Sequence, residues 1–296
     1  MSADFILRAT SSLYGLLVGD ALGSQFYVPA NRPALAARTL PPAPWQWTDD
    51  TEMACSIYHL LAELGGIDQD ALAGSFAARH DFDRGYGPAT NRLLRLVREG
   101  GDWRALAAGL FDHSGSWGNG AAMRVAPLGA WFAGDPARAA AQARLSAEVT
   151  HTHPEGVAGA VAVAVAAAVA GAGLSPGRFV DQVLEHTPPG RVRDGIAAAR
   201  RLLTVRDPAL AAYELGNGRD VAAHDTVPFT IWAAAGNLGD FTEAFWTTAA
   251  AGGDVDTNCA IVCGILGEPP PAWVRLCEPP PSWANVPPYR PGNVRP

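Results

Sequence analysis

Apolar residues recur along this chain with the three- and four-residue spacing of helices that bury one face. In residues 7–22, leucines share a face with Gly15 and Gly19, and Gly23 continues this four-residue spacing at the next position. Glycines spaced in this way let a second backbone approach closely. The same periodicity predicts further helices over residues 53–64, 69–78, 90–99, 103–110, 121–132, 136–149, 154–172, 176–185, 192–203, 209–214, 227–235, 241–251 and 257–266.

Strand signals are nearly absent, because no segment outside one Val/Ala run sustains the alternation of β-branched and polar residues. That run, Val157–Leu174, carries no charge but consists mostly of alanine, glycine and valine. A membrane span needs about 20 residues and usually has stronger hydrophobes than alanine. We therefore expect an all-α protein in which this run is a helix buried on all sides.

The turns between these helices contain Gly-Gly and Pro-Pro pairs, and no segment has the composition of a flexible linker between two cores. The sequence predicts one compact orthogonal helical bundle over residues 1–267. From Glu268 onwards proline becomes frequent, which predicts a tail over residues 268–296 laid on the same domain by Trp273, Trp283 and Tyr289. A polyproline ligand for an aromatic groove is the alternative interpretation of this tail.

Composition excludes several chemistries. All 22 basic residues are arginine, so a Schiff-base, pyridoxal-phosphate or P-loop lysine is ruled out. The net charge of −7 disfavours an extended nucleic-acid surface. With 48% hydrophobic and 17% charged residues, the chain can bury a large core.

The four cysteines form no CxxC pair, and the N-terminus lacks a basic and apolar leader. We expect a cytoplasmic protein with reduced thiols and no membrane association. Cys259 and Cys263 are spaced to share a helix face as half of a zinc site, but no second pair completes it. Buried thiols are the simpler interpretation.

Two short acidic segments each precede an apolar helix. Trp47–Glu52 holds three carboxylates and two hydroxyls, and Gly252–Thr257 holds two carboxylates and a hydroxyl after a Gly-Gly turn. The alternative interpretation of each segment is an ordinary helix N-cap followed by an acidic first turn. If the two segments meet, their aspartates need cations to offset mutual repulsion, and hard oxygen donors suit Mg²⁺ or Mn²⁺. A two-metal site favours hydrolysis.

Two further segments are candidates for ligand contacts. Gly115–Arg124 surrounds serine, tryptophan and asparagine with glycines before a helix, a pattern suited to a phosphate or pyrophosphate but also common in tight turns. His151 and His153 precede the buried Val/Ala helix. Their spacing is compatible with three roles: a general base, a metal ligand, or a side chain that forms hydrogen bonds at the start of the helix.

Taken in order, five motifs resemble the ADP-ribosylglycohydrolase family, the relatives of dinitrogenase-reductase-activating glycohydrolase. These motifs are GxxxGDALG at residues 15–23, WTDDTEM at 47–53, GNGAAMR at 118–124, Thr150-His151, and GGDVDT at 252–257. The resemblance implies an all-α domain with two Mg²⁺, or Mn²⁺, at the base of a cleft for ADP-ribose. It implies hydrolysis of an α-glycosidic bond to ADP-ribose, with Asp50 or Asp256 accepting a proton from water.

The resemblance also assigns site residues by position. The metal ligands it implies are Thr48, Asp49, Asp50, Asp254, Asp256 and Thr257. The substrate-binding residues it implies are Ser116, Trp117, Gly118, Asn119 and His151, with Tyr86 and Gly87 from a loop near the cleft mouth. Asp20 matches an aspartate that supports the metal ligands from behind.

One departure from the family pattern concerns specificity. Many members carry a glutamate seven residues after the first-motif aspartate, where this chain has Tyr27. Members that release ADP-ribose from serine rely on this glutamate, so the resemblance favours an arginine linkage here. The alternatives are a module that binds ADP-ribose or a nucleotide with little turnover, and a hydrolase for ADP-ribose linked to a small molecule or nucleobase. We expect a monomer.

Overall fold

A computed structural model describes residues 3–292 of the chain, and these residues form helices and no sheet. The predicted all-α class is therefore confirmed. The α-helices are α1 Ala3–Ser24, α2 Arg32–Ala37, α3 Asp49–Leu64, α4 Gln69–Arg79, α5 Pro88–Arg98, α6 Trp103–Ala108, α7 Leu110–His113, α8 Gly120–Met123, α9 Ala126–Trp131, α10 Pro136–Glu148, α11 Pro154–Val169, α12 Pro176–His186, α13 Arg191–Arg201, α14 Pro208–Leu215, α15 Ala223–Gly236, α16 Phe241–Ala250, α17 Val255–Leu266 and α18 Pro271–Val274. Short 3-10 turns are η1 Gln25–Tyr27, η2 Pro29–Asn31, η3 Phe82–Arg84, η4 Ala170–Ala172 and η5 Ser282–Ala284.

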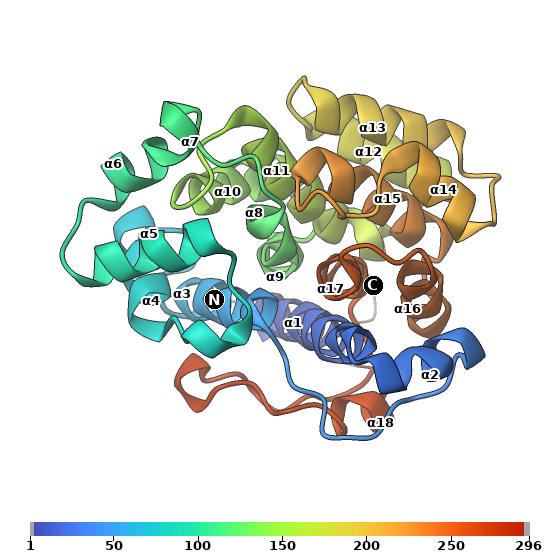
Figure 1. Ribbon diagram of the computed structural model, residues 1–296. Helices are drawn as coiled ribbons and strands as arrows, with labels where there is room; N and C mark the ends of the chain where they lie inside the picture. The colour runs from blue at the N-terminus through green and yellow to red at the C-terminus, as the bar shows by residue number, and fades with distance from the viewer. Residues whose placement is uncertain (1–2, 293–296) are drawn as a thin grey trace.

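Helices α1 and α17 lie side by side at the centre of the molecule (Figure 1). The glycines of α1 face the backbone of α17 in antiparallel order: Gly15 meets Cys263, Gly19 meets Cys259, and Gly23 meets Asp256. A Cβ at Gly23 would lie 2.7 Å from the Cα of Asp256. The glycine spacing thus brings the start of α17, with its aspartates, against the end of α1.

Gly19→Ala tests this close approach. The added Cβ would collide with the backbone carbonyl of Cys259, so the two helices must separate, and we expect a loss of about 1–3 kcal/mol in the free energy of unfolding. Gly74→Ala on α4 is the matched control, since nothing lies within 4 Å of its Cβ position. An exposed helical alanine should there stabilise by up to about 1 kcal/mol. Equal urea midpoints for the two variants would contradict the packing argument.

The Val/Ala run forms α11, and every side chain from Gly156 to Val169 is buried. Helix α11 contacts α8, α9, α10, α12, α15 and α17, which confirms the predicted central helix. By length and composition alone, Asp4–Tyr27 and Pro154–Ala172 could each cross a membrane. In both, 78% of the most apolar window is buried inside the protein, as in core helices of soluble proteins.

The prediction of one continuous helix over residues 121–132 is wrong. This segment is divided into α8 and α9, and Arg124 and Val125 lie between them. Pro127 lies in the first turn of α9. A proline has no N–H to donate within a continuous helix, and its ring would clash with the carbonyl four residues earlier. The break places Arg124, which is fully buried, at the centre of the molecule.

The proline-rich tail packs on the helical body as far as residue 292, and its predicted residues 293–296 lie outside the described part. Glu278 accepts two hydrogen bonds of 2.8 Å from the guanidinium of Arg84, which also stacks 3.4 Å from the centre of the Trp47 ring. Farther along, the ring of Tyr289 packs 5.3 Å from that of Tyr14. The tail therefore braces the segment that leads into α3.

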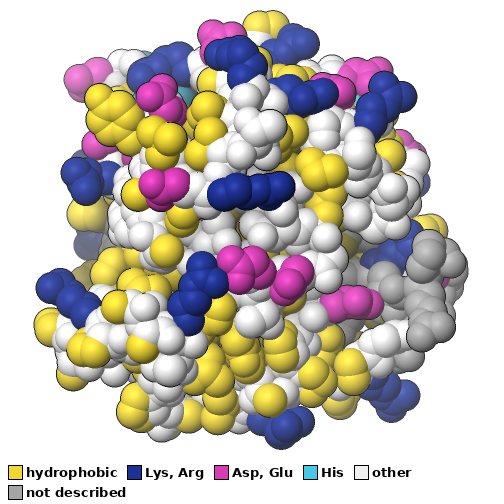
Figure 2. Space-filling model, turned by 90° about the vertical axis from the view of Figure 1, so that its right-hand side faces the viewer, with side chains coloured by type: hydrophobic (Ala, Val, Ile, Leu, Met, Phe, Trp, Pro, Cys, Tyr) yellow, Lys and Arg dark blue, Asp and Glu magenta, His cyan; other side chains and the backbone are white. Residues whose placement is uncertain are grey.

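Charged side chains are dispersed on the face drawn in Figure 2. Arginines there are separated by acidic and uncharged side chains rather than gathered into one patch.

Candidate active site

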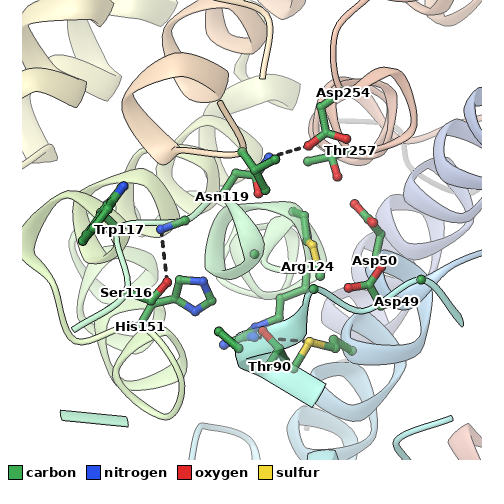
Figure 3. A pocket seen from close by; sticks show the side chains of 18 of the residues that line it. Asp49, Asp50, Thr90, Ser116, Trp117, Asn119, Arg124, His151, Asp254 and Thr257 are labelled. Atoms are coloured by element: carbon green, nitrogen blue, oxygen red, sulfur yellow. Dashed lines mark hydrogen bonds between the residues drawn. The ribbon is translucent and has the colours of Figure 1, made fainter. Parts of the chain in front are cut away.

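The two acidic segments meet at one cavity of about 490 Å³. Figure 3 shows Asp49 and Asp50, at the start of α3, facing Asp254 and Thr257, at the start of α17. Eleven of the predicted site residues line this cavity: Asp49, Asp50, Gly87, Ser116, Trp117, Gly118, Asn119, His151, Asp254, Asp256 and Thr257. Segments about 200 residues apart in sequence thus share one site.

Neither acidic segment is simply a helix cap. Thr48 and Asp254 occupy the N-cap positions of α3 and α17, yet neither side chain caps its own helix. The Thr48 hydroxyl hydrogen bonds to Asp20 at 2.8 Å and to Asp50 at 3.1 Å. Asp254 accepts a hydrogen bond of 2.7 Å from the side-chain amide of Asn119. Both side chains thus bond to other residues around the acidic cluster instead of to the first turns of their own helices.

Asp20 holds the start of α3 in place from behind the cavity. Its carboxylate accepts from the backbone and hydroxyl of Thr48, at 2.9 and 2.8 Å, and from those of Thr51, at 3.1 and 2.6 Å. The Asp20 side chain is fully buried on α1, one residue after Gly19. The glycine contact with α17 therefore also fixes where this carboxylate lies.

The carboxylates crowd together strongly enough to disfavour their charged forms. Burial, with further repulsion from neighbouring carboxylates, raises the pKa of Asp49 and Asp50 well above the usual value. Burial and the charge of Asp256 raise the pKa of Asp20, and likewise that of Asp254, to about 7.

The same cluster fits divalent cations. Single carboxylate oxygens of Asp20, Asp50 and Asp256 lie within 4.8 Å of one another, the only such acidic, histidine or cysteine group in residues 3–292. The buried Oδ1 of Asp50 has no hydrogen-bond partner. A positive charge is the partner that such oxygens lack, and all-oxygen donors suit Mg²⁺ or Mn²⁺. The cysteines, all buried, form no comparable group in this range.

Tyr27 contacts both aspartates of the second acidic segment. Its hydroxyl lies 2.8 Å from Asp256 Oδ1 and 3.2 Å from Asp254 Oδ1, and it accepts a hydrogen bond from the backbone of Val255. Burial and the two carboxylates raise the pKa of this phenol, so it stays neutral. The Tyr27 hydroxyl therefore reaches the acidic cluster as a hydrogen-bond donor.

The glycine loop forms the opposite wall. Three backbone amides of residues 115–120 are already used. Gly115 donates to the carbonyl of Leu110, Gly118 donates to the Ser116 hydroxyl, and Asn119 donates to the carbonyl of Val221. Trp117 is 38% exposed at the cavity edge, and its ring lies 4.8 Å from that of Phe111. A phosphate bound at this loop could therefore accept hydrogen bonds from only some of its backbone amides.

His151 and Arg124 lie behind the glycine loop. Both line the cavity, and both are almost completely buried. Burial, with the charge of Arg124, lowers the pKa of His151 to about 3, and burial lowers the pKa of Arg124 to about 9. The imidazole is thus neutral at physiological pH, and a buried guanidinium supplies positive charge beside it.

Three predicted residues do not line the cavity: Thr48, Asp20 and Tyr86. The hydroxyl of Tyr86 donates to Glu52 at 2.7 Å, and Glu52 also accepts from the backbone of Asp81. The third acid of the first segment therefore points away from the cluster. It anchors the loop whose glycines, Gly85 and Gly87, form part of the cavity wall.

Residues outside the predicted site also line the cavity: Met53, Gly85, Pro88, Ala89, Thr90, Phe111, Gly120, Met123, Arg124, Asp220 and Val221. Four of them lie within the sequence motifs: Met53 ends the first acidic motif, and Gly120, Met123 and Arg124 belong to the glycine motif. Phe111 belongs to an unusual turn in which residues 111–113 all have positive φ. No sequence pattern predicts such a turn, because its left-handed residues are not glycine.

The fold and the cavity define an all-α protein with an oxygen-donor site suited to metal-assisted hydrolysis. Residues 1–268 match the family described as ADP-ribosylglycohydrolase. Human ADP-ribosylhydrolase ARH3 is 27% identical, with 93% of this chain and 90% of that protein aligned. The ADP-ribosyl-(dinitrogen reductase) glycohydrolase of Rhodospirillum rubrum is 31% identical over 50% of this chain and 52% of its own length.

A solved structure described as an ADP-ribosylglycohydrolase-related protein complex shares the fold. Its TM-score is 0.67 at 24% identity, with 96% of this chain and 97% of that chain covered. The chain belongs to the ADP-ribosylglycohydrolase family and is a glycosyl hydrolase.

Proposed function

We propose that this protein hydrolyses the α-glycosidic bond that links ADP-ribose to an acceptor, with two Mg²⁺, or Mn²⁺, as cofactors. The observation that carries the proposal is the convergence of two acidic helix starts on one cavity, opposite a glycine loop with an exposed aromatic pair. The names of the relatives, which are ADP-ribosyl hydrolases, support the same substrate.

The proposed cation ligands are Thr48, Asp49, Asp50, Asp254, Asp256 and Thr257. Bound cations would polarise ribose hydroxyls and lower the pKa of a nearby water. We assign to Asp50 or Asp256 the role of accepting a proton from the attacking water. Carboxylates around the anomeric carbon also favour the positive charge that develops in an oxocarbenium-like transition state. Asp20 keeps Thr48 in position for this role.

The rest of the cavity suits the other parts of ADP-ribose. The exposed rings of Phe111 and Trp117 offer an aromatic surface on which a purine can stack. Ser116, Gly118, Asn119 and His151 line the wall between these rings and the acidic cluster, where a diphosphate and the adjoining ribose would lie. Gly87 lines the opposite side, and Tyr86 supports that loop through Glu52.

The linkage we favour is ADP-ribosyl-arginine. Tyr27 presents a neutral hydroxyl to the acidic cluster, where a family glutamate would present a carboxylate. Hydrolysis of a serine linkage needs a base that takes a proton from the attacking water, and the departing serine oxygen must gain a proton. A neutral phenol whose pKa is raised cannot act as that base as a glutamate carboxylate can. A serine linkage is therefore disfavoured, whereas the chemistry assigned to the aspartates does not need this position. We place the enzyme in the cytoplasm as a monomer.

A second candidate function is a module that binds ADP-ribose with little turnover. Loss of the glutamate at Tyr27 is the observation that favours it. The geometry around the cluster favours the enzyme, because a binding module has no use for crowded carboxylates whose pKa values are raised.

The test is a panel of ADP-ribose conjugates with arginine, serine, nucleobase and phosphate linkages, each assayed for ADP-ribose release. We expect release from the arginine conjugate with Mg²⁺, little release with excess EDTA, and a much slower reaction on the serine conjugate. Tight ADP-ribose binding without turnover on any linkage would support the binding module. Faster release from serine than from arginine would overturn the argument from Tyr27.

A further inference from the structure

Arg124 is a buried cation without an anionic partner. Its side chain is fully buried, and among residues 3–292 it takes part in none of the ion pairs. Its guanidinium instead lies 4.5 Å from the centre of the Phe76 ring and donates to the Ser146 carbonyl at 3.0 Å and the Thr150 hydroxyl at 2.9 Å. A buried charge usually has a carboxylate partner, so these neutral contacts need a reason.

The contact with Thr150 determines where the threonine proton goes. A guanidinium only donates, so the Thr150 oxygen must accept from Arg124. The same hydroxyl lies 2.7 Å from Nδ1 of His151, and it has no other partner among the described residues. If Nδ1 carried a proton, the threonine oxygen would accept twice, and its own proton would be buried without an acceptor.

The other arrangement satisfies both the Thr150 hydroxyl and Nδ1 of His151. Thr150 donates to Nδ1, the imidazole is neutral, and its proton is on Nε2. The Nε2 atom has no hydrogen-bond partner among residues 3–292 and faces the glycine loop, 3.2 Å from where a Cβ would lie at Gly118 and at Gly120. The glycines thus leave room for this end of the ring, which lines the cavity.

We propose that Arg124 and Thr150 are positioning residues that hold His151 as the Nε2–H tautomer, so that its ring donates a hydrogen bond to a phosphate or ribose oxygen of the ligand. The ligand in this inference rests on the proposed function. A ring nitrogen that carries a proton has no lone pair in the plane of the ring. His151 is therefore neither the base nor a metal ligand through Nε2, which decides between the roles that its sequence position left open.

The tautomer is read directly by long-range ¹H–¹⁵N NMR of the full-length, ¹⁵N-histidine-labelled protein with Mg²⁺. We expect the His151 signals, assigned by their loss in His151→Gln, to show a protonated Nε2 and a bare Nδ1 that do not titrate between pH 5 and 8. Thr150→Val should release this preference, and Thr150→Ser should restore it. A protonated Nδ1 in the wild type, or titration of the ring near neutral pH, would overturn the proposal.

Calorimetric titration with ADP-ribose tests the consequence for binding. We expect Thr150→Val to weaken binding about tenfold, the usual effect of losing one hydrogen bond to a charged group, and Thr150→Ser to recover it. Thr187→Val is the matched control, because Thr187 is buried outside the cavity and donates only to a helix carbonyl. Equal affinities for Thr150→Val and the wild type would overturn the inference.

The two proposals fail separately. If the wild type neither binds nor hydrolyses ADP-ribose, the proposed function is wrong and so is the ligand named here, while the NMR spectrum still decides the tautomer. If ADP-ribose is hydrolysed but Nδ1 carries the proton, the proposed function stands and this inference is wrong. Should Thr150→Val not fold, the wild-type spectrum and the Thr150→Ser affinity decide it.

Discussion

Replacing Asp256 by asparagine is expected to reduce ADP-ribose release from the arginine conjugate by more than about 100-fold at saturating Mg²⁺. Asparagine keeps the shape of the side chain but removes a negative charge from the cluster with Asp20 and Asp50. It also removes the proton acceptor that we assign to the reaction. The measurement is the initial rate of ADP-ribose release by chromatography, paired with Mg²⁺ affinity from calorimetric titration.

The control for this variant is Asp181→Asn. Asp181 pairs with Arg200 on the surface, away from the cavity, so the same chemical change should leave rate and Mg²⁺ affinity unchanged. Thermal denaturation in EDTA supplies an independent check. Because the carboxylates repel one another without cations, Asp256→Asn should raise the melting temperature of the metal-free protein. Wild-type turnover by Asp256→Asn would remove this residue from the proposed mechanism.

The second large effect is on stability, and it links pH to metal. Without cations, we expect the buried carboxyl groups to destabilise the folded protein as the pH rises from about 4 to about 7. The folded-state pKa of Asp20 and of Asp254 is about 7, against an ordinary 3.8. The folded state therefore holds protons that the unfolded state has already lost, and stability falls with pH across that interval.

Mg²⁺ should reverse this loss, because cations replace the protons at the same oxygens. We expect the increase in melting temperature on adding Mg²⁺ to be small at pH 5 and several degrees larger at pH 8. Comparing the two conditions at each pH cancels the opposite contribution of His151. Because the folded-state pKa of His151 is lowered from its ordinary value of 6.5, this residue favours the folded protein above pH 6.5. That contribution to stability is lost as the pH falls below 6.5. An equal Mg²⁺ effect at both pH values would contradict the crowding of the carboxylates.

Much of the fold could be predicted because helix formation is local. The three- and four-residue periodicity located most helices, and the uncharged Val/Ala composition identified the central helix α11. The prediction failed where a single residue overrides periodicity, as Pro127 does between α8 and α9. It also missed helices α2 and α18, which contain too few residues for a periodic pattern to be recognised.

The candidate site was predictable in its chemistry and less so in its geometry. Carboxylates, hydroxyls and glycines stood out by type, and most of those chosen line the cavity. Yet Asp50 and Glu52, two residues apart, face different partners: Asp50 lines the cavity, and Glu52 bonds to Tyr86. Residues this close on a helix point in different directions, and only the surrounding helices determine which direction is the cavity.

By itself, the sequence determined the all-helical class, the buried central helix and a set of oxygen donors suited to Mg²⁺. Those properties depend on residue type and local spacing, which the chain carries directly. Only the tertiary structure decided that the two acidic segments meet, that the Tyr27 hydroxyl reaches Asp256, and that Arg124 contacts Thr150. Each of these contacts joins residues far apart in the chain. Their distances depend on how closely whole helices approach, as α1 and α17 do at Gly19.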